Sequence, residues 1–98
     1  MGDKFRVVLT DEAKAELKRL QKRDVVRARK VASALKRLRE HGPSYPSLKS
    51  HKIASIPGPY GETWQSYIEN HTPGAWRIFW HYGPSTGVIT VFLIREHL

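Results

Sequence analysis

Residues 72–83 read TPGAWRIFWHYG, a run that sets aromatic and aliphatic residues around a single arginine, Arg77. Aromatic and β-branched residues favour strands, in which successive side chains point to opposite faces of a sheet. This alternation places Trp76, Ile78 and Trp80 on one face and Arg77 on the other. Because helices can cover only one face here, we expect the bulky face to pack beneath them and Arg77 to point outward from the uncovered face.

The segment before this run predicts a short strand and two helices. Residues 4–10, KFRVVLT, have the composition of a strand. In residues 11–23 and 24–41, apolar residues recur at helical spacing, with lysine and arginine on the opposite sides. Thr10 or Asp11 is suited to cap the first helix and Asp24 the second, which Gly42 ends. The two helices are expected to form a hairpin.

The rest of the chain holds β-rich runs separated by turn residues. These runs cover residues 51–56, 62–70, 75–83 and 87–97, a spacing typical of antiparallel strands. A chain of 98 residues supports a single core. We therefore expect one domain over residues 1–98 with an α+β fold. Its N-terminal strand joins an antiparallel sheet, and the two-helix hairpin packs on one face of that sheet.

The composition indicates an anionic partner. Seventeen Lys and Arg residues against nine Asp and Glu residues give a formal net charge of +8 at pH 7. This charge indicates a binding partner that is a nucleic acid, an acidic protein or an anionic membrane surface, and it does not distinguish among the three. No apolar run approaches the ~20 residues of a membrane span, and the charged N-terminal residues do not match a secretory segment. We expect a cytoplasmic protein that does not cross a membrane.

Metal and cofactor sites are not expected. The chain has no cysteine, which excludes disulfides and thiolate zinc sites. His41, His71 and His81 have neither the HxxxH spacing of metal ligands nor a nearby pair of carboxylates.

Four segments carry a resemblance to a known family: LKSHKI (residues 48–53), GETWQSYI (61–68), GAWRIFWHYG (74–83) and VFLIREHL (91–98). Their order after a strand and two helices resembles the RelE/ParE superfamily of bacterial toxins from toxin–antitoxin systems. The resemblance implies a RelE-like fold and a cognate acidic antitoxin that holds the toxin inactive, with DNA contacted only indirectly through the antitoxin complex. Toxins of the RelE branch cleave messenger RNA in the ribosomal A site, whereas those of the ParE branch inhibit DNA gyrase.

Metal-independent RNA cleavage uses the neighbouring 2′-hydroxyl as nucleophile, so the protein must supply a base, an acid and a fixed cation. Arg77 suits the cation role because its fork of donors grips two phosphate oxygens. The alternative is a structural ion pair with Glu62 or Glu69. His97 is a candidate proton carrier and Arg95 a candidate RNA contact, and both lie near Arg77 if the last two strands pair. The alternative for His97 is a frayed chain end.

Further candidates lie in two neighbouring segments. The resemblance places Lys49, His51 and Lys52 beside the RNA-binding face, where lysines neutralise phosphates. Lys49 and His51 are candidate catalytic residues, His51 as a second proton carrier, and Lys52 is a candidate RNA contact. The alternative is a solvated basic loop. Many relatives carry an acidic residue followed by an arginine in the next strand, whereas this chain has Gln65 and Tyr67 at the outward positions. Both are candidate RNA contacts, and Tyr67 is suited to stack on a splayed base.

Three functional hypotheses follow. The favoured one is a ribosome-dependent endoribonuclease toxin, because proton carriers that converge on a cationic face have no use in a pure binding module. The second is a ParE-like inhibitor of DNA gyrase without nuclease activity. The third is a basic RNA-binding domain that cleaves nothing and tolerates loss of His97.

Overall fold

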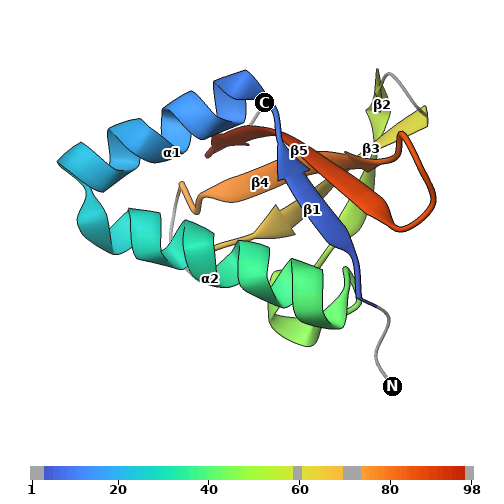
Figure 1. Ribbon diagram of the computed structural model, residues 1–98, viewed down its shortest axis with the longest axis horizontal. Coiled ribbons are helices and arrows are strands. Elements are labelled where there is room, and N and C mark those ends of the chain that lie inside the picture. The colour runs from blue at the N-terminus through green and yellow to red at the C-terminus, as the bar shows by residue number, and fades with distance from the viewer. Residues whose placement is uncertain (1–3, 59–60, 70–73, 97–98) are drawn as a thin grey trace.

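A two-helix hairpin covers one face of a five-stranded sheet in the computed structural model of the chain, which describes residues 4–58, 61–69 and 74–96 (Figure 1). The described elements are β1 (Arg6–Leu9), α1 (Asp11–Arg23), α2 (Val25–His41), the 3-10 helix η1 (Pro46–Leu48), β2 (His51–Gly58), β3 (Gly61–Tyr67), β4 (Arg77–Tyr82) and β5 (Val88–Arg95). The predicted order of strands and helices is confirmed.

The two helices begin and end where the sequence supplies capping groups. The Thr10 hydroxyl accepts a hydrogen bond from the Ala13 N–H at 3.2 Å, and the Asp24 carboxylate accepts one from the Arg27 N–H at 3.1 Å. These side chains satisfy N–H groups that have no partner within the helix. Gly42 ends α2 with a φ of 81°, a left-handed conformation that glycine adopts without steric cost. None of the helices in the described part of the chain is long and apolar enough to cross a membrane.

The sheet has the strand order β1-β5-β4-β3-β2. Neighbouring strands from β2 to β5 are antiparallel, whereas β1 pairs with β5 in parallel, so Arg6 lies opposite Val88. The expectation of a wholly antiparallel sheet is therefore wrong for β1. A tight hairpin forces two consecutive strands to run antiparallel, but β1 and β5 are separated by most of the chain and are free of that constraint.

The core lies between the helices and the sheet. Trp80 is fully buried, its ring stacks on Trp64 with 5.6 Å between centroids, and its indole N–H donates to the Ser66 hydroxyl at 2.9 Å. The predicted packing of the Trp76, Ile78 and Trp80 face beneath the helices is confirmed. The buried cluster consists of Ala13, Leu20, Ala28, Val31, Ala34, Leu35, Leu38, Leu48, Ile78, Trp80, Ile89, Val91 and Ile94.

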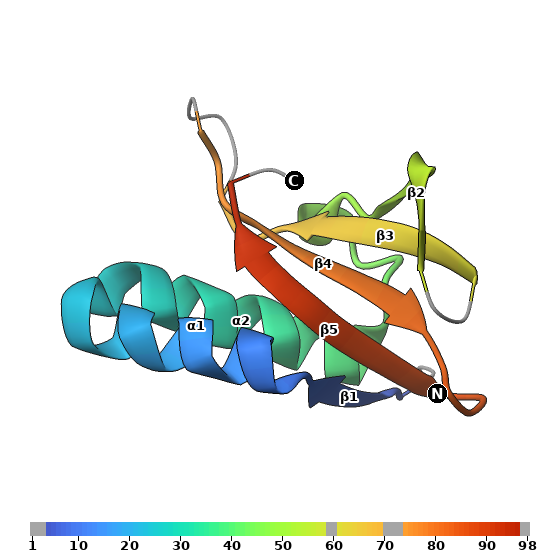
Figure 2. The same ribbon diagram turned by 90° about the horizontal axis from the view of Figure 1, so that it is seen from above.

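The opposite face of the sheet is less open than the sequence suggested. Gln65, Phe79 and His81 are buried there, and Arg77 is half-buried rather than fully exposed. The β4–β5 pairing shifts register after Phe79, leaving Phe92 as an extra residue whose ring stacks on His81 at 5.8 Å. Bulges bend strands and increase twist. The sheet accordingly curves, and Figure 2 shows β2 running steeply across the direction of β3.

Candidate functional site

Arg77 occupies the first position of β4, on the sheet face that points away from the helices. Its Cα lies opposite Tyr67 of β3 on one side and opposite Arg95 of β5 on the other. Residues opposite each other in a sheet share a face, so the three side chains form one row. The predicted proximity of Arg95 to Arg77 is confirmed.

The Arg77 guanidinium is held by an aromatic ring and an amide. Its Cζ lies 5.0 Å from the centroid of the Tyr67 ring, a cation–π distance, and its Nη1 lies 3.5 Å from Gln65 Oε1. The Nε atom is buried and has no hydrogen-bond partner among the described residues. A buried guanidinium N–H without a partner is costly. The arginine is therefore oriented but retains unused hydrogen-bonding capacity.

The carboxylates considered as structural partners of Arg77 are engaged elsewhere. Glu62 accepts a hydrogen bond from the Lys52 ammonium at 3.1 Å, and Glu69 accepts one from Arg27 of α2 at 3.3 Å. No carboxylate lies within ion-pair distance of Arg77 in the parts of the chain that the structure describes. The structural ion-pair alternative for Arg77 is wrong.

His51 joins this group from the edge strand β2. Its Nε2 lies 2.7 Å from Gln65 Nε2, and its Nδ1 lies 3.0 Å from the backbone carbonyl oxygen of Lys49. The His51 and Tyr67 rings are 6.2 Å apart. We call His51, Gln65, Tyr67 and Arg77 the site cluster. It is a continuous set of contacts across β2, β3 and β4.

Two lysines near the site cluster take different positions. Lys49 is exposed and ends η1 with a φ of 46°, a left-handed conformation that turns the chain into β2. Lys52 lies opposite Trp64, so alternation puts it on the face of β2 away from His51, where it binds Glu62. The structure therefore brings Lys49 to the edge of the site cluster but not Lys52.

The structure bears on the expected role of Tyr67 but does not describe His97. The Tyr67 ring carries the Arg77 guanidinium on one face, so its contact in the free protein is with this arginine and that face is not open to a base. His97 lies outside the described residues, and its role stays a prediction. Arg95, two residues before it, is exposed at the end of β5.

The contacts of Glu69 were not predicted from the sequence. Its side chain is only 10% exposed and accepts hydrogen bonds from the Trp76 N–H at 3.0 Å and from Arg27 and Lys30 of α2 at 3.3 Å. Burial raises the pKa of Glu69, but the hydrogen bonds from these three donors outweigh burial and leave the pKa below its usual range. Glu69 thus ties α2 to the residue that precedes Arg77.

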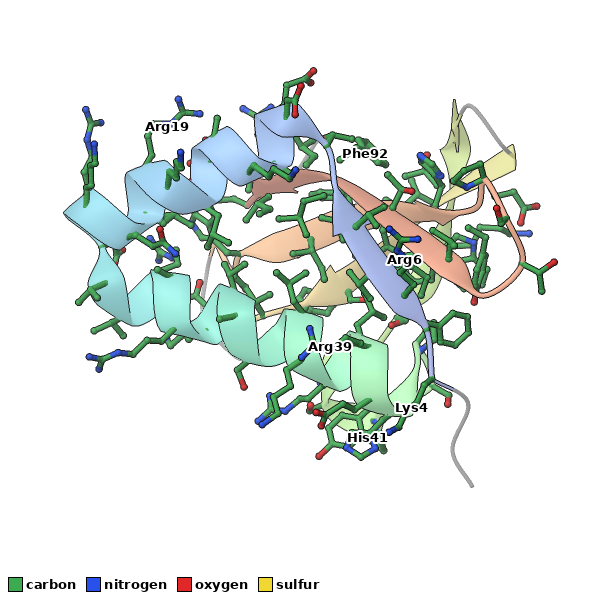
Figure 3. All side chains as sticks on the ribbon, in the orientation of Figure 1. Lys4, Arg6, Arg19, Arg39, His41 and Phe92 are labelled. Carbon is green, nitrogen blue, oxygen red and sulfur yellow. The ribbon has the colours of Figure 1, made fainter. Side chains whose placement is uncertain are left out.

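The excess positive charge is concentrated on the helices rather than around the site cluster. Helices α1 and α2 hold eleven of the seventeen Lys and Arg residues and only four of the nine Asp and Glu residues. Figure 3 shows Arg19 projecting outward from α1, while Arg39 and His41 project near the C-terminal end of α2. Among the described residues, no group of three His, Asp or Glu side chains is placed to hold a metal ion.

Comparison with known proteins gives matches among solved structures alone. No protein-family model matches the chain, and a search of curated proteins found no match. The YoeB dimer from Staphylococcus aureus superposes with a TM-score of 0.71 at 15% identity, covering 97% of this chain and 99% of that one. The heterotetrameric YoeB–YefM toxin–antitoxin complex from the same organism gives a TM-score of 0.67 at 15% identity, covering 96% and 98%.

An archaeal protein shares the same architecture. The RelE–RelB complex from Pyrococcus horikoshii OT3 matches with a TM-score of 0.66 at 12% identity, covering 94% of this chain and 93% of that one. At these identities the comparisons establish architecture over nearly the whole chain, and the RelE-like α+β fold expected from the sequence is confirmed. The chain has the fold of the YoeB and RelE toxins.

Proposed function

We propose that this protein is a toxin of the RelE/ParE superfamily and that it cleaves messenger RNA on the ribosome. The observation that supports this most is Arg77, a half-buried arginine that no described carboxylate neutralises and whose Nε is unpaired. Buried cations are normally paired. An arginine oriented in this way and left without an anion is suited to bind a phosphate that arrives with the substrate.

The proposed reaction needs no metal. His51 removes the proton from a ribose 2′-hydroxyl, and the 2′-oxygen attacks the adjacent phosphorus. The bond from phosphorus to the 5′-oxygen breaks, and His97 gives that oxygen a proton. The products are a 2′,3′-cyclic phosphate and a 5′-hydroxyl end. Arg77 stabilises the charge that builds on the phosphate oxygens, the role in which preorganised donors contribute most.

A cognate acidic antitoxin is the proposed regulatory partner. The YoeB and RelE proteins of similar fold were solved in complexes with YefM and RelB. In this chain the cations of α1 and α2 supply a surface to which an acidic segment would be attracted. The ribosome and messenger RNA are the proposed substrate complex, and we place the protein in the cytoplasm, where both occur.

Induction of the protein in a bacterial host tests the proposal against its competitors. Messenger RNA 5′ ends should map to positions in frame with translation, and induction of the Arg77→Ala variant at matched level should leave messages intact. Intact messages together with altered supercoiling of a reporter plasmid would favour inhibition of DNA gyrase instead. Unchanged messages and topology, with RNA retained by the purified protein, would favour RNA binding without cleavage.

A further inference from the structure

The side-chain amide of Gln65 stands between Arg77 and His51. Its Oε1 lies 3.5 Å from Arg77 Nη1 and its Nε2 lies 2.7 Å from His51 Nε2. Gln65 is only 6% exposed, so its amide is held in place and cannot exchange these contacts freely for water. On the far side of the imidazole, His51 Nδ1 lies 3.0 Å from the Lys49 carbonyl oxygen.

The chemistry of these groups determines where the protons lie. A backbone carbonyl oxygen only accepts, so His51 Nδ1 must carry a proton and donate a hydrogen bond to the Lys49 carbonyl oxygen. An arginine only donates, so the oxygen of the Gln65 amide faces Arg77 and the NH₂ group faces His51. His51 Nε2 therefore accepts a hydrogen bond and carries no proton. In a doubly protonated His51, the Nε2–H group would face the Gln65 NH₂ group, and two donors would stand 2.7 Å apart.

We propose that Gln65 is a positioning residue, oriented by Arg77, that holds His51 as the neutral Nδ1–H tautomer, with the Nε2 lone pair accepting a hydrogen bond from the Gln65 NH₂ group. This inference rests on the proposed function, in which His51 is the base. It assigns Gln65 a role different from direct RNA contact: the amide fixes the form of the imidazole that is able to take a proton.

The unequal lengths of the two contacts suggest how substrate acts on this arrangement. At 3.5 Å the Arg77–Gln65 contact is at the outer limit of a hydrogen bond, whereas the Gln65–His51 contact is short. A phosphate offers Arg77 a stronger, charged acceptor than the amide oxygen. Phosphate binding therefore draws Arg77 from Gln65, the amide loses its orientation, and the His51 lone pair is released to the 2′-hydroxyl.

The groups around His51 leave the amide as its main electrostatic neighbour. Tyr67 faces it from β3, Lys49 precedes it in the chain, and Arg77 reaches it through Gln65. Within the ranges that the structure describes, His51 has no carboxylate in ion-pair contact. A carboxylate placed at position 65 would thus be a new partner, and it would accept a hydrogen bond from a protonated Nε2, whereas the amide donates a hydrogen bond to a bare Nε2.

The test uses nuclear magnetic resonance of the full chain with ¹⁵N-labelled histidine. The wild-type protein should show His51 with a protonated Nδ1 and a bare Nε2. The midpoint of the His51 titration should lie at least about one pH unit higher in Gln65→Glu than in Gln65→Leu, since an opposite charge in contact shifts a titration by about 1–3 units. Lys52→Glu compared with Lys52→Leu is the matched control pair, because it also exchanges an apolar side chain for one carboxylate, but on the other face of β2, and should give a smaller shift.

Three results would overturn the assignment: the Nε2–H tautomer in the wild-type protein, equal midpoints in Gln65→Glu and Gln65→Leu, or an equal difference in midpoint between Lys52→Glu and Lys52→Leu. None of these measurements uses RNA. If the wild-type tautomer and the Gln65→Glu shift are found but the protein cleaves no message, the proposed function fails while the role of Gln65 stands. If messages are cleaved and His51 is the Nε2–H tautomer, the role of Gln65 fails alone.

Discussion

At the scale of single residues, the environment of Arg77 distinguishes it from the other cations of the sheet. Its guanidinium lies over the Tyr67 ring, contacts the Gln65 amide and has a buried Nε, whereas Arg95 beside it is exposed. A planar guanidinium can stack on a ring and bind two phosphate oxygens at once, and an ammonium group cannot do both. The contacts at this position therefore require the planar guanidinium of arginine, and a positive charge alone would not make them.

Arg77→Lys should lose most of the cleavage activity while the protein stays folded. The lysine keeps the charge but loses the bidentate grip and the stacking on Tyr67. The rate of ribosome-dependent cleavage and the melting temperature are the measurements, and Arg95→Lys, an exposed neighbour in the same row, is the matched control that should retain most activity. A rate for Arg77→Lys within about threefold of wild type would show that charge alone suffices.

His97→Ala should slow cleavage by about 10²–10⁴-fold, the usual contribution of a positioned proton carrier. RNA binding should be nearly unchanged, because the substitution removes no fixed charge from the phosphate-binding residues. Single-turnover rates and a filter-binding titration with ribosome-bound message separate the two effects. Equal loss of binding and rate would assign His97 to substrate contact instead of proton transfer.

At the scale of elements, the largely buried carboxylate of Glu69 joins the helix hairpin to the β3–β4 hairpin. Glu69 follows β3 and accepts from the Trp76 N–H, and Arg27 of α2 both donates to Glu69 and lies 4.8 Å from the centroid of the Trp76 ring. Because Trp76 immediately precedes Arg77, this contact also fixes where β4 begins.

Glu69→Gln should reduce the free energy of unfolding by about 1–3 kcal/mol at neutral pH, because hydrogen bonds to a charged group are lost or weakened. Glu62→Gln is the matched control: its ion pair with Lys52 has side chains 59% and 46% exposed, and exposed pairs contribute about 0–1 kcal/mol. Thermal or urea unfolding of the three proteins measures the difference. A Glu69→Gln variant no less stable than Glu62→Gln would contradict the role of this contact.

The same contact has a defined pH dependence. The pKa of Glu69 is lowered in the folded protein, so its contribution to stability is fully present above the unfolded value near 4.5 and is lost as pH falls through the folded pKa. The stability gap between wild type and Glu69→Gln should therefore narrow as pH falls below that value. A gap that stays constant down to strongly acidic pH would show that the charge of Glu69 is not what stabilises.

At the scale of the whole molecule, most of the positive charge lies on the helices, apart from the site cluster. The helices hold most of the Lys and Arg residues, and the site cluster lies on the sheet face away from them. Figure 1 shows α1 and α2 forming a layer of their own beside the sheet. This separation is consistent with the proposed function, in which the helices attract the acidic antitoxin and the site cluster carries out the cleavage.

Association with the proposed acidic antitoxin should be fast at low salt and should slow steeply as salt rises, because charge complementarity acts mainly on the association rate. Replacing Arg29, Lys36 and Arg39 of α2 by alanine should flatten this salt dependence, and Lys52→Ala should not. Stopped-flow kinetics over a salt series measures both. A rate independent of salt would show that the charge of the helices does not guide this partner.

The elements and the core-facing residues were predictable because their signals are local. Alternation in residues 75–83 assigned Trp80 and Arg77 to opposite faces, and capping residues set the helix limits. The direction of β1 and the Arg27–Glu69 contact, which joins residues 42 apart, depend on tertiary packing that no local pattern encodes. The four residues of the site cluster were separate candidates in the sequence, but their contacts, with the Gln65 amide between Arg77 and His51, follow only from strand register.

Arg77 is proposed to serve a reaction on RNA. Single-turnover cleavage of message on a programmed ribosome, measured for wild type and Arg77→Ala beside their thermal melts, tests it most directly. Loss of one preorganised donor costs about 10²–10³-fold in rate, so the variant should be slower by at least about a hundredfold with its melting temperature nearly unchanged, since Arg77 lies outside the core. A near-normal cleavage rate in Arg77→Ala, or a sharply lowered melting temperature, would contradict this role of Arg77.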